Sequence, residues 1–98
     1  MRVQATLDPR DAADPLQLEE RLRAGLGAYV HRVRRAGVHV WSSDAERTVA
    51  VTLRLAIVQG PPIMLRVEGR ELDDTLAFAV ARARAAVARR TAGRGPSR

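Results

Sequence analysis

Residues 48–58, TVAVTLRLAIV, form the longest stretch in which apolar and other side chains alternate. An alternation with a period of two places successive side chains on opposite faces of a β-strand. Three shorter segments, residues 1–7, 38–42 and 63–68, alternate in the same way. The chain is therefore expected to form a sheet with one apolar face and one mixed face. In the longest strand the apolar face consists of Val49, Val51, Leu53, Leu55 and Ile57.

Two other segments carry apolar residues at helical spacing. The first begins at Asp14, which can cap the helix, and Pro15, which suits the first helical position. Gln17 completes a capping box. This helix is predicted to run to about residue 35, with Arg34 and Arg35 near its C-terminal end and Gly37 closing it. Its apolar stripe consists of Leu18, Leu22, Leu26, Tyr29 and Val33.

Residues 69–74 lead into the second helix. Asp73 and Asp74 suit its positive N-terminal end, and Arg89 and Arg90 suit its negative C-terminal end. Its apolar stripe consists of Leu72, Leu76, Ala79, Val80, Ala83 and Val87.

The order of elements is β-α-β-β-β-α, which predicts an α+β fold. The simplest packing is a four-stranded mixed sheet with both helices on one face and the other face open. The first strand is expected to pair in parallel with its neighbour through a right-handed crossover, and the last three strands to form an antiparallel meander. A chain of 98 residues predicts a single domain, residues 1–91, with 92–98 as a disordered basic tail.

The composition favours a globular protein of the cytoplasm. Apolar residues make up 46% of the chain and charged residues 29%, a balance that fits neither disorder nor a membrane protein. No cysteine is present, which excludes disulfides and thiolate metal ligands. The N-terminal residues do not form a signal peptide. No membrane partner is expected.

The positive charge is concentrated at one end of the chain. Residues 1–74 contain equal numbers of arginines and acids, so the net charge of +6 arises from the six arginines of residues 75–98. A terminal block of one sign often binds a nucleic acid or an acidic surface. The alternative is a solvated helix face followed by a frayed tail.

The sequence does not predict an enzyme. His31 and His39 are expected on solvent-facing surfaces, and neither pairs predictably with a serine and a carboxylate. The two histidines lack metal-ligand spacing. No cofactor and no small-molecule substrate are therefore expected.

The arginines are stronger candidates for a binding site. Arg82 and Arg89 fall on the flank of the second helix away from its apolar stripe, with Phe78 one turn before Arg82. An exposed aromatic ring with nearby guanidinium groups can stack on a base and neutralise an RNA backbone. Phe78 leaning into the boundary with the first helix is the alternative. If the helices are neighbours, arginines of both helices are expected to rim one groove; the candidates are Arg82, Arg84, Arg89 and Arg90 from the second helix and Arg21 and Arg32 from the first, with Arg35 further round.

The open sheet face is the second candidate surface. Alternation places Trp41, His39, Arg54, Met64 and Arg66 on this face. Trp41 between basic residues fits a stacking platform for RNA. Structural cover of the sheet, or contact between two copies in a homodimer, explains the exposed apolar side chains equally well.

Three segments resemble the ribosome hibernation-promoting factor family, also called ribosome-associated inhibitor A or sigma-factor modulation proteins. Residues 38–44, VHVWSSD, are similar to the second strand of the family and its acidic turn. Residues 67–76, VEGRELDDTL, resemble the approach to its last helix, and 79–83, AVARA, its alanine-rich helix. Thr75 and Leu76 stand where the family often has an aromatic residue, and the second helix lacks the lysines usual there.

The resemblance implies a β-α-β-β-β-α domain of the short type, without the additional C-terminal domain of long members. It also implies a translation inhibitor that binds the small ribosomal subunit and its rRNA, in the channel where messenger and transfer RNA sit, and so silences idle ribosomes. Basic helix residues make the family's contacts. That role transfers first to Arg82, and then to Arg89 and Arg90 at the end of the same helix.

Overall fold

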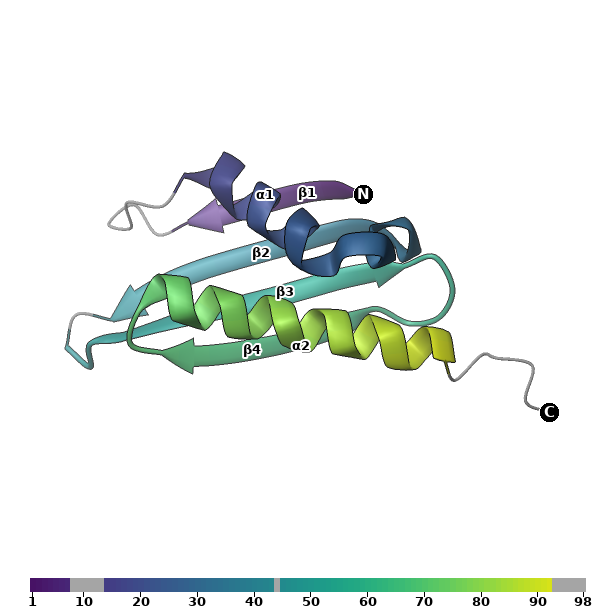
Figure 1. The fold of residues 1–98 in the computed structure, drawn as a ribbon. Helices are drawn as coiled ribbons and strands as arrows, with labels where there is room; N and C mark the ends of the chain where they lie inside the picture. The colour runs from purple at the N-terminus through teal and green to yellow at the C-terminus, as the bar shows by residue number, and fades with distance from the viewer. Residues whose placement is uncertain (8–13, 44, 93–98) are drawn as a thin grey trace.

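The computed structural model describes residues 1–7, 14–43 and 45–92, except the side chains of residues 91 and 92. The chain folds in the predicted β-α-β-β-β-α order (Figure 1). A short 3₁₀ helix, η1, is inserted after the first helix. The elements are β1 (Arg2–Leu7), α1 (Pro15–Leu26), η1 (Gly27–Arg32), β2 (Val33–Ser43), β3 (Thr48–Ile57), β4 (Ile63–Gly69) and α2 (Leu72–Ala92).

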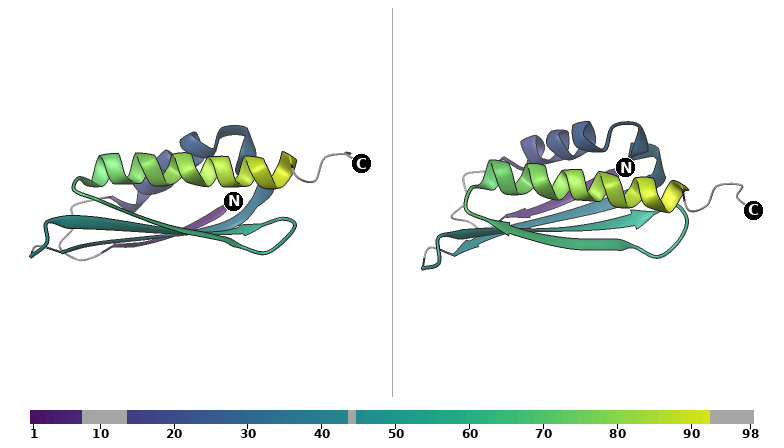
Figure 2. Two further views of the ribbon diagram at one scale, coloured as in Figure 1. Left: turned by 90° about the horizontal axis from the view of Figure 1, so that it is seen from below. Right: turned by 60° about the horizontal axis from the view of Figure 1, so that its bottom comes forward.

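The four strands form one mixed sheet in the order β1-β2-β3-β4. β1 and β2 are parallel, and the β2–β3 and β3–β4 pairs are antiparallel, as predicted. Both helices lie on the same face of this sheet and leave the opposite face uncovered (Figure 2). The α+β architecture expected from the sequence is therefore confirmed.

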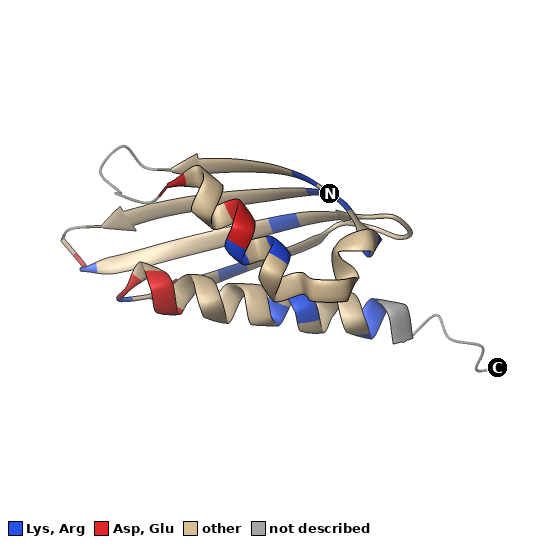
Figure 3. Ribbon diagram, turned by 45° about the horizontal axis from the view of Figure 1, so that its top comes forward, with Lys and Arg blue, Asp and Glu red and all other residues tan. Residues whose placement is uncertain are grey.

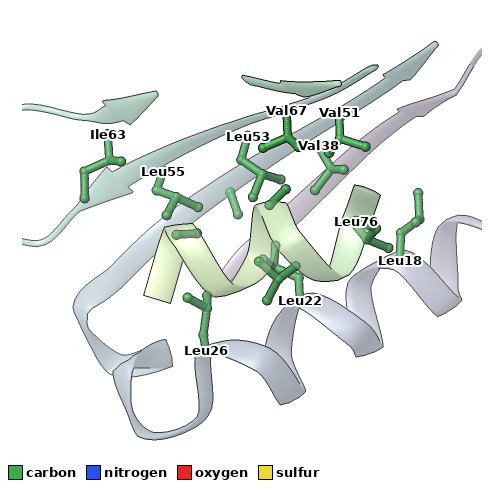
Figure 4. Close-up of a cluster of buried hydrophobic side chains, with 14 of the residues drawn as sticks. Leu18, Leu22, Leu26, Val38, Val51, Leu53, Leu55, Ile63, Val67 and Leu76 are labelled. Atoms are coloured by element: carbon green, nitrogen blue, oxygen red, sulfur yellow. The ribbon is translucent and has the colours of Figure 1, made fainter. Parts of the chain in front are cut away.

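The core lies between the two helices and the apolar face of the sheet (Figure 4). The strand alternation was predicted correctly, because Val51, Leu53 and Leu55 of β3 are fully buried. The helical stripes were also correct from Leu18 to Leu26 and from Leu76 to Val87. The buried apolar contacts of α1 and α2 with the sheet, rather than helix propensity, supply most of the driving force for folding.

The start of α1 was predicted correctly. The Asp14 side chain accepts a hydrogen bond of 3.0 Å from the backbone N–H of Leu16, and Pro15 occupies the first helical position. Two acidic residues, Asp73 and Asp74, lie in the first turn of α2, and Arg89 and Arg90 in its last turn. These charges complement the helix dipole as expected.

The predicted end of the first helix was wrong. α1 ends at Leu26, and Gly27 has φ 58° and ψ −128°, a conformation that L-residues with a side chain rarely adopt. The N–H of Gly27 closes the helix by donating to the carbonyl oxygen of Arg23. Gly27 is therefore a helix stop signal and not merely a weak helix former.

Residues 33–37 belong to β2, not to the helix. Arg34, Arg35 and Gly37, predicted to end the helix, are strand residues. A register shift between Val33 and Arg35 inserts one extra residue against β3. This β-bulge allows both Val33 and Ala36, three positions apart, to be buried.

Gly25 brings α1 and α2 into close contact. A Cβ atom at this position would overlap the side chain of Val80 on α2. The close approach of the two helices therefore requires glycine at position 25. Gly27 has no neighbour of this kind, since a Cβ there would meet nothing within 4 Å.

Two sequence predictions concern residues outside the described part of the chain. They are Asp44 in the acidic turn after the second strand and residues 93–98 of the expected tail. α2 extends through Ala92, so the first residue of that expected tail is helical. Within the described ranges, no helix is long and apolar enough to cross a membrane.

Candidate nucleic-acid interface

Arg82, Arg89 and Arg90 line one groove between α2 and the edge strand β4. We call this hollow of about 640 Å³ the α2–β4 groove; Ile63, Met64, Leu65 and Ala86 complete its lining. Arg82 and Arg89 are both exposed. They lie on one flank of α2 because seven residues make nearly two helical turns.

The charged residues that line the α2–β4 groove are all arginines. None of the described residues that line it is acidic. Arg82 and Arg89 form no ion pair with any other described residue. On α2, acidic residues lie at the N-terminal end, whereas the arginines lie in the C-terminal half (Figure 3). The guanidinium groups are therefore available to an external anion.

Arg90 has a structural contact as well as a place in the groove. Its Nη1 donates a hydrogen bond of 2.8 Å to the carbonyl oxygen of Pro61, in the loop between β3 and β4. This bond holds one edge of the Arg90 guanidinium against the protein. Arg90 is therefore less free than Arg82 and Arg89 to follow a ligand.

Phe78 is exposed to solvent. The residue is 57% exposed and lines neither groove beside α2. The alternative in which Phe78 leans into the boundary with the first helix is therefore wrong. Its position one turn before Arg82 leaves the ring free to contact a base at the end of the α2–β4 groove.

A second groove separates α1 from α2. It measures about 720 Å³, and among its lining residues are Arg21, Tyr29 and Arg84. Arg21 donates to Asp73 Oδ1 at 2.8 Å and to the Asp73 carbonyl oxygen at 3.1 Å, so this arginine ties α1 to the start of α2. The guanidinium of Arg84 lies 5.8 Å from the centre of the Tyr29 ring.

The arginines of the two helices therefore rim two grooves rather than one. Arg82 and Arg89 face β4, whereas Arg84 and Arg21 face the space between the helices. Arg32 lies in η1, is exposed and lines neither groove. Arg35, predicted near the first helix end, is in β2.

On the open sheet face, three of the predicted residues, His39, Trp41 and Arg66, are joined by contacts. The guanidinium of Arg66 lies 4.7 Å from the centre of the Trp41 ring, and the His39 ring meets Trp41 edge-on at 4.6 Å. Arg66 also donates to Glu68 at 2.7 Å. Trp41 is half-buried, so it partly covers the face while remaining accessible at its margin.

Arg35 and Gly37 were not predicted on the open face. They belong to it together with Gln4, Arg54 and Ala56, which line a hollow beside them. The alternation of buried and exposed residues in β2 could have revealed their position. Buried Ala36, Val38 and Val40 extend the strand pattern backwards across Gly37, which had been interpreted as a helix stop.

The described residues contain no group of three or more histidines or carboxylates that could hold a metal ion. His39 contacts an aromatic ring, and the ion pairs of Glu19 and Glu68 join ordinary surface side chains. These pairs have the geometry of surface salt bridges, which contribute little to stability.

Comparison with solved structures identifies the fold. The chain is similar to a ribosomal subunit interface protein from Coxiella burnetii, with a TM-score of 0.79 and 14% sequence identity over 94% of this chain and 99% of that one. It is also similar to the N-terminal domain of protein Y from Thermus thermophilus, with a TM-score of 0.69 and 14% identity over 91% of this chain and 98% of that domain. No sequence-family profile matches the chain, and no curated protein has significant sequence similarity to it. The fold implied by the sequence resemblance is confirmed.

Proposed function

We propose that the protein is a non-enzymatic, cytoplasmic translation inhibitor of the hibernation-factor type. It binds the small ribosomal subunit by placing ribosomal RNA against the α2–β4 groove. One observation carries this proposal: Arg82 and Arg89 line a groove to which the described part of the chain contributes no acidic residue. Such a groove fits a phosphate backbone, whose affinity for proteins is dominated by basic side chains.

The fold supports the ribosomal assignment. Both similar structures span nearly the whole chain, and the first is named as a ribosomal subunit interface protein. Fold alone does not define a function, so the proposal also depends on the site. The site agrees, because α2 segregates its charge and presents its basic half on one flank.

The alternative function, a module that dimerises through the open sheet face, has less support. A two-fold pair brings the same patch of both copies together. That patch includes Arg35, Arg54 and Arg66, of which only Arg66 has a carboxylate partner among the described residues. Face-to-face pairing would therefore oppose like charges, which is unfavourable.

A salt series tests the proposed function. The protein is sedimented with purified small subunits at rising salt concentrations, and bound protein is quantified in the pellet. If arginines neutralise phosphates, log affinity falls against log salt with a slope of about −0.7 to −0.9 per phosphate contact. Absence of binding at low salt, or an affinity insensitive to salt, contradicts the proposal. Sizing chromatography of the free protein over the same series tests the dimer.

A further inference from the structure

The open face of the sheet contains a gap at Gly37. The strand register places Gln4, Gly37, Arg54 and Met64 side by side across all four strands. Glycine contributes no side chain to this row, and two adjoining hollows of about 430 and 320 Å³ lie there. Both hollows share Gln4, Gly37 and Arg54 as lining residues.

The fold itself does not require glycine at this position. Gly37 is not among the described glycines with positive φ, which are Gly27 and Gly60. A Cβ atom at Gly37 would meet only the carbonyl oxygen of Arg54, at 4.0 Å. Glycine weakens a strand, and it often marks a position where a ligand or another backbone approaches closely. No described chain segment fills the hollow, so it is open to an external ligand.

The lining of the two hollows combines arginines and polar side chains with apolar residues such as Ala56, Ile57 and Met64. Arg35 and Arg54 lie at its edge, are exposed and form no ion pair with the other described residues. Within the described ranges, no acidic residue lines either hollow. Thr6, His39 and Thr52 add hydrogen-bonding groups to the smaller hollow. This donor set complements an anion with several acceptor oxygens, such as a phosphodiester.

An aromatic pair adjoins the hollow. His39 lines the smaller hollow and meets Trp41 edge-on, and the Arg66 guanidinium lies over the Trp41 ring. Basic side chains along a groove combined with stacking rings are the features with which proteins bind single-stranded nucleic acid. A second copy of this chain is a poorer occupant, because it would bring another set of arginines to the same surface.

We propose that the open sheet face is a second binding site, which holds a phosphate of single-stranded RNA over Gly37 between Arg35 and Arg54 and an adjacent base against His39 and Trp41. The site goes beyond the proposed function, because it lies on the sheet face opposite the helices (Figure 2). It does not depend on ribosome binding through the α2–β4 groove.

Trp41 provides the readout, since it is the single tryptophan of the chain. The full chain is titrated with hexauridylate at low salt while tryptophan emission is recorded. The parent should show a saturable change in emission. Arg54→Ala should weaken binding at least about tenfold, the loss expected for one charge-assisted hydrogen bond. Arg47→Ala is the matched control, because Arg47 is exposed in the turn between β2 and β3 and should bind as the parent does.

Filling the hollow gives the most specific test. Gly37→Ala should weaken binding slightly, and Gly37→Val should abolish it without lowering the melting temperature, since valine favours strands and finds space here. Parent-like binding by both Gly37→Val and Arg54→Ala overturns the proposal. An equal loss in Arg47→Ala also overturns it, by showing unspecific charge attraction. If inorganic phosphate alone, at matched concentration, produces the same emission change, the hollow is a simple anion site and the RNA proposal is overturned.

The proposed α2–β4 groove and the proposed open-face site can be tested independently of each other. Reversing Arg82 and Arg89 should remove binding to small subunits and leave the hexauridylate titration unchanged. Loss of hexauridylate binding in that variant, with intact binding in Gly37→Val, would place the single-stranded RNA on the helix side and overturn the open-face site.

Discussion

Arg90 of α2 donates a hydrogen bond of 2.8 Å to the carbonyl oxygen of Pro61, twenty-nine residues earlier in the chain. The bond joins the last turns of α2 to the loop between β3 and β4. In this loop Gly60 has φ 102°, and a Cβ there would come within 2.7 Å of Arg90 Nη1. The loop backbone and the guanidinium therefore fit together, and Arg90 has a structural role that its neighbour Arg89 lacks.

Arg90→Ala should lower the free energy of unfolding by about 1 kcal/mol more than Arg89→Ala does, the net value of a typical hydrogen bond. Both substitutions remove one charge from the same helix end, so the dipole contribution cancels in the comparison. Urea denaturation of the two variants measures the difference. Equal stability would mean that the Pro61 contact contributes nothing.

Gly27→Ala should destabilise the fold by roughly 1–3 kcal/mol, because alanine must adopt the positive φ that ends α1. No steric clash contributes, since the space around a Cβ here is empty. Thermal unfolding followed by circular dichroism measures the effect. A variant as stable as the parent would imply that the helix can end by another route.

Gly25→Ala should also destabilise the fold, through a different cause. The new methyl group meets the side chain of Val80, and overpacking of this kind costs roughly 1–3 kcal/mol. Val80→Ala should relieve the overlap, so the double variant should be more stable than the two single effects predict together. Strict additivity would show that α1 and α2 are not in contact at this point.

Trp41→Ala should cost less than the roughly 3–5 kcal/mol of a core tryptophan, because Trp41 is only half-buried on the open face. Its coupling to Arg66, measured in a double-mutant cycle by denaturant unfolding, should be about 0.5–1 kcal/mol, the value of an exposed cation–π pair. A loss in the core range would place the ring among the buried side chains.

The strands were predictable because each alternates against a single core. In β3, Leu53 and Arg54 differ so strongly in polarity that only one register buries the right side chains. The helix end was not predicted because Val33 continues the helical spacing by coincidence. The decisive residue, Gly27, acts through its backbone conformation, which hydrophobic periodicity does not reveal.

The sequence predicted how the candidate site residues are arranged along one helix, but not which other element this helix flank faces. Helical spacing correctly placed Arg82 and Arg89 on one flank, but it gave no information on the neighbour of that flank, which is β4 rather than α1. The pairing of Arg21 with Asp73 joins residues 52 positions apart and arises only when the helices pack. The hollow at Gly37 went unnoticed because β2 was predicted to begin too late.

The central claim is that the α2–β4 groove binds the small subunit, and charge reversal tests it most directly. The double variant Arg82→Glu, Arg89→Glu should still fold. Exposed substitutions usually change the free energy of unfolding by about 0.5 kcal/mol, and loss of the favourable Arg89 charge at the helix end lowers it by roughly 0.3–1 kcal/mol. The matched control is Arg47→Glu, Arg70→Glu, which changes the net charge equally at two exposed positions outside the groove.

Co-sedimentation with small ribosomal subunits at low salt is the deciding measurement. The parent and the control variant should pellet with the subunits, whereas the Arg82→Glu, Arg89→Glu variant should stay in the supernatant. A folded Arg82→Glu, Arg89→Glu variant that pellets with the subunits as fully as the parent would contradict the account.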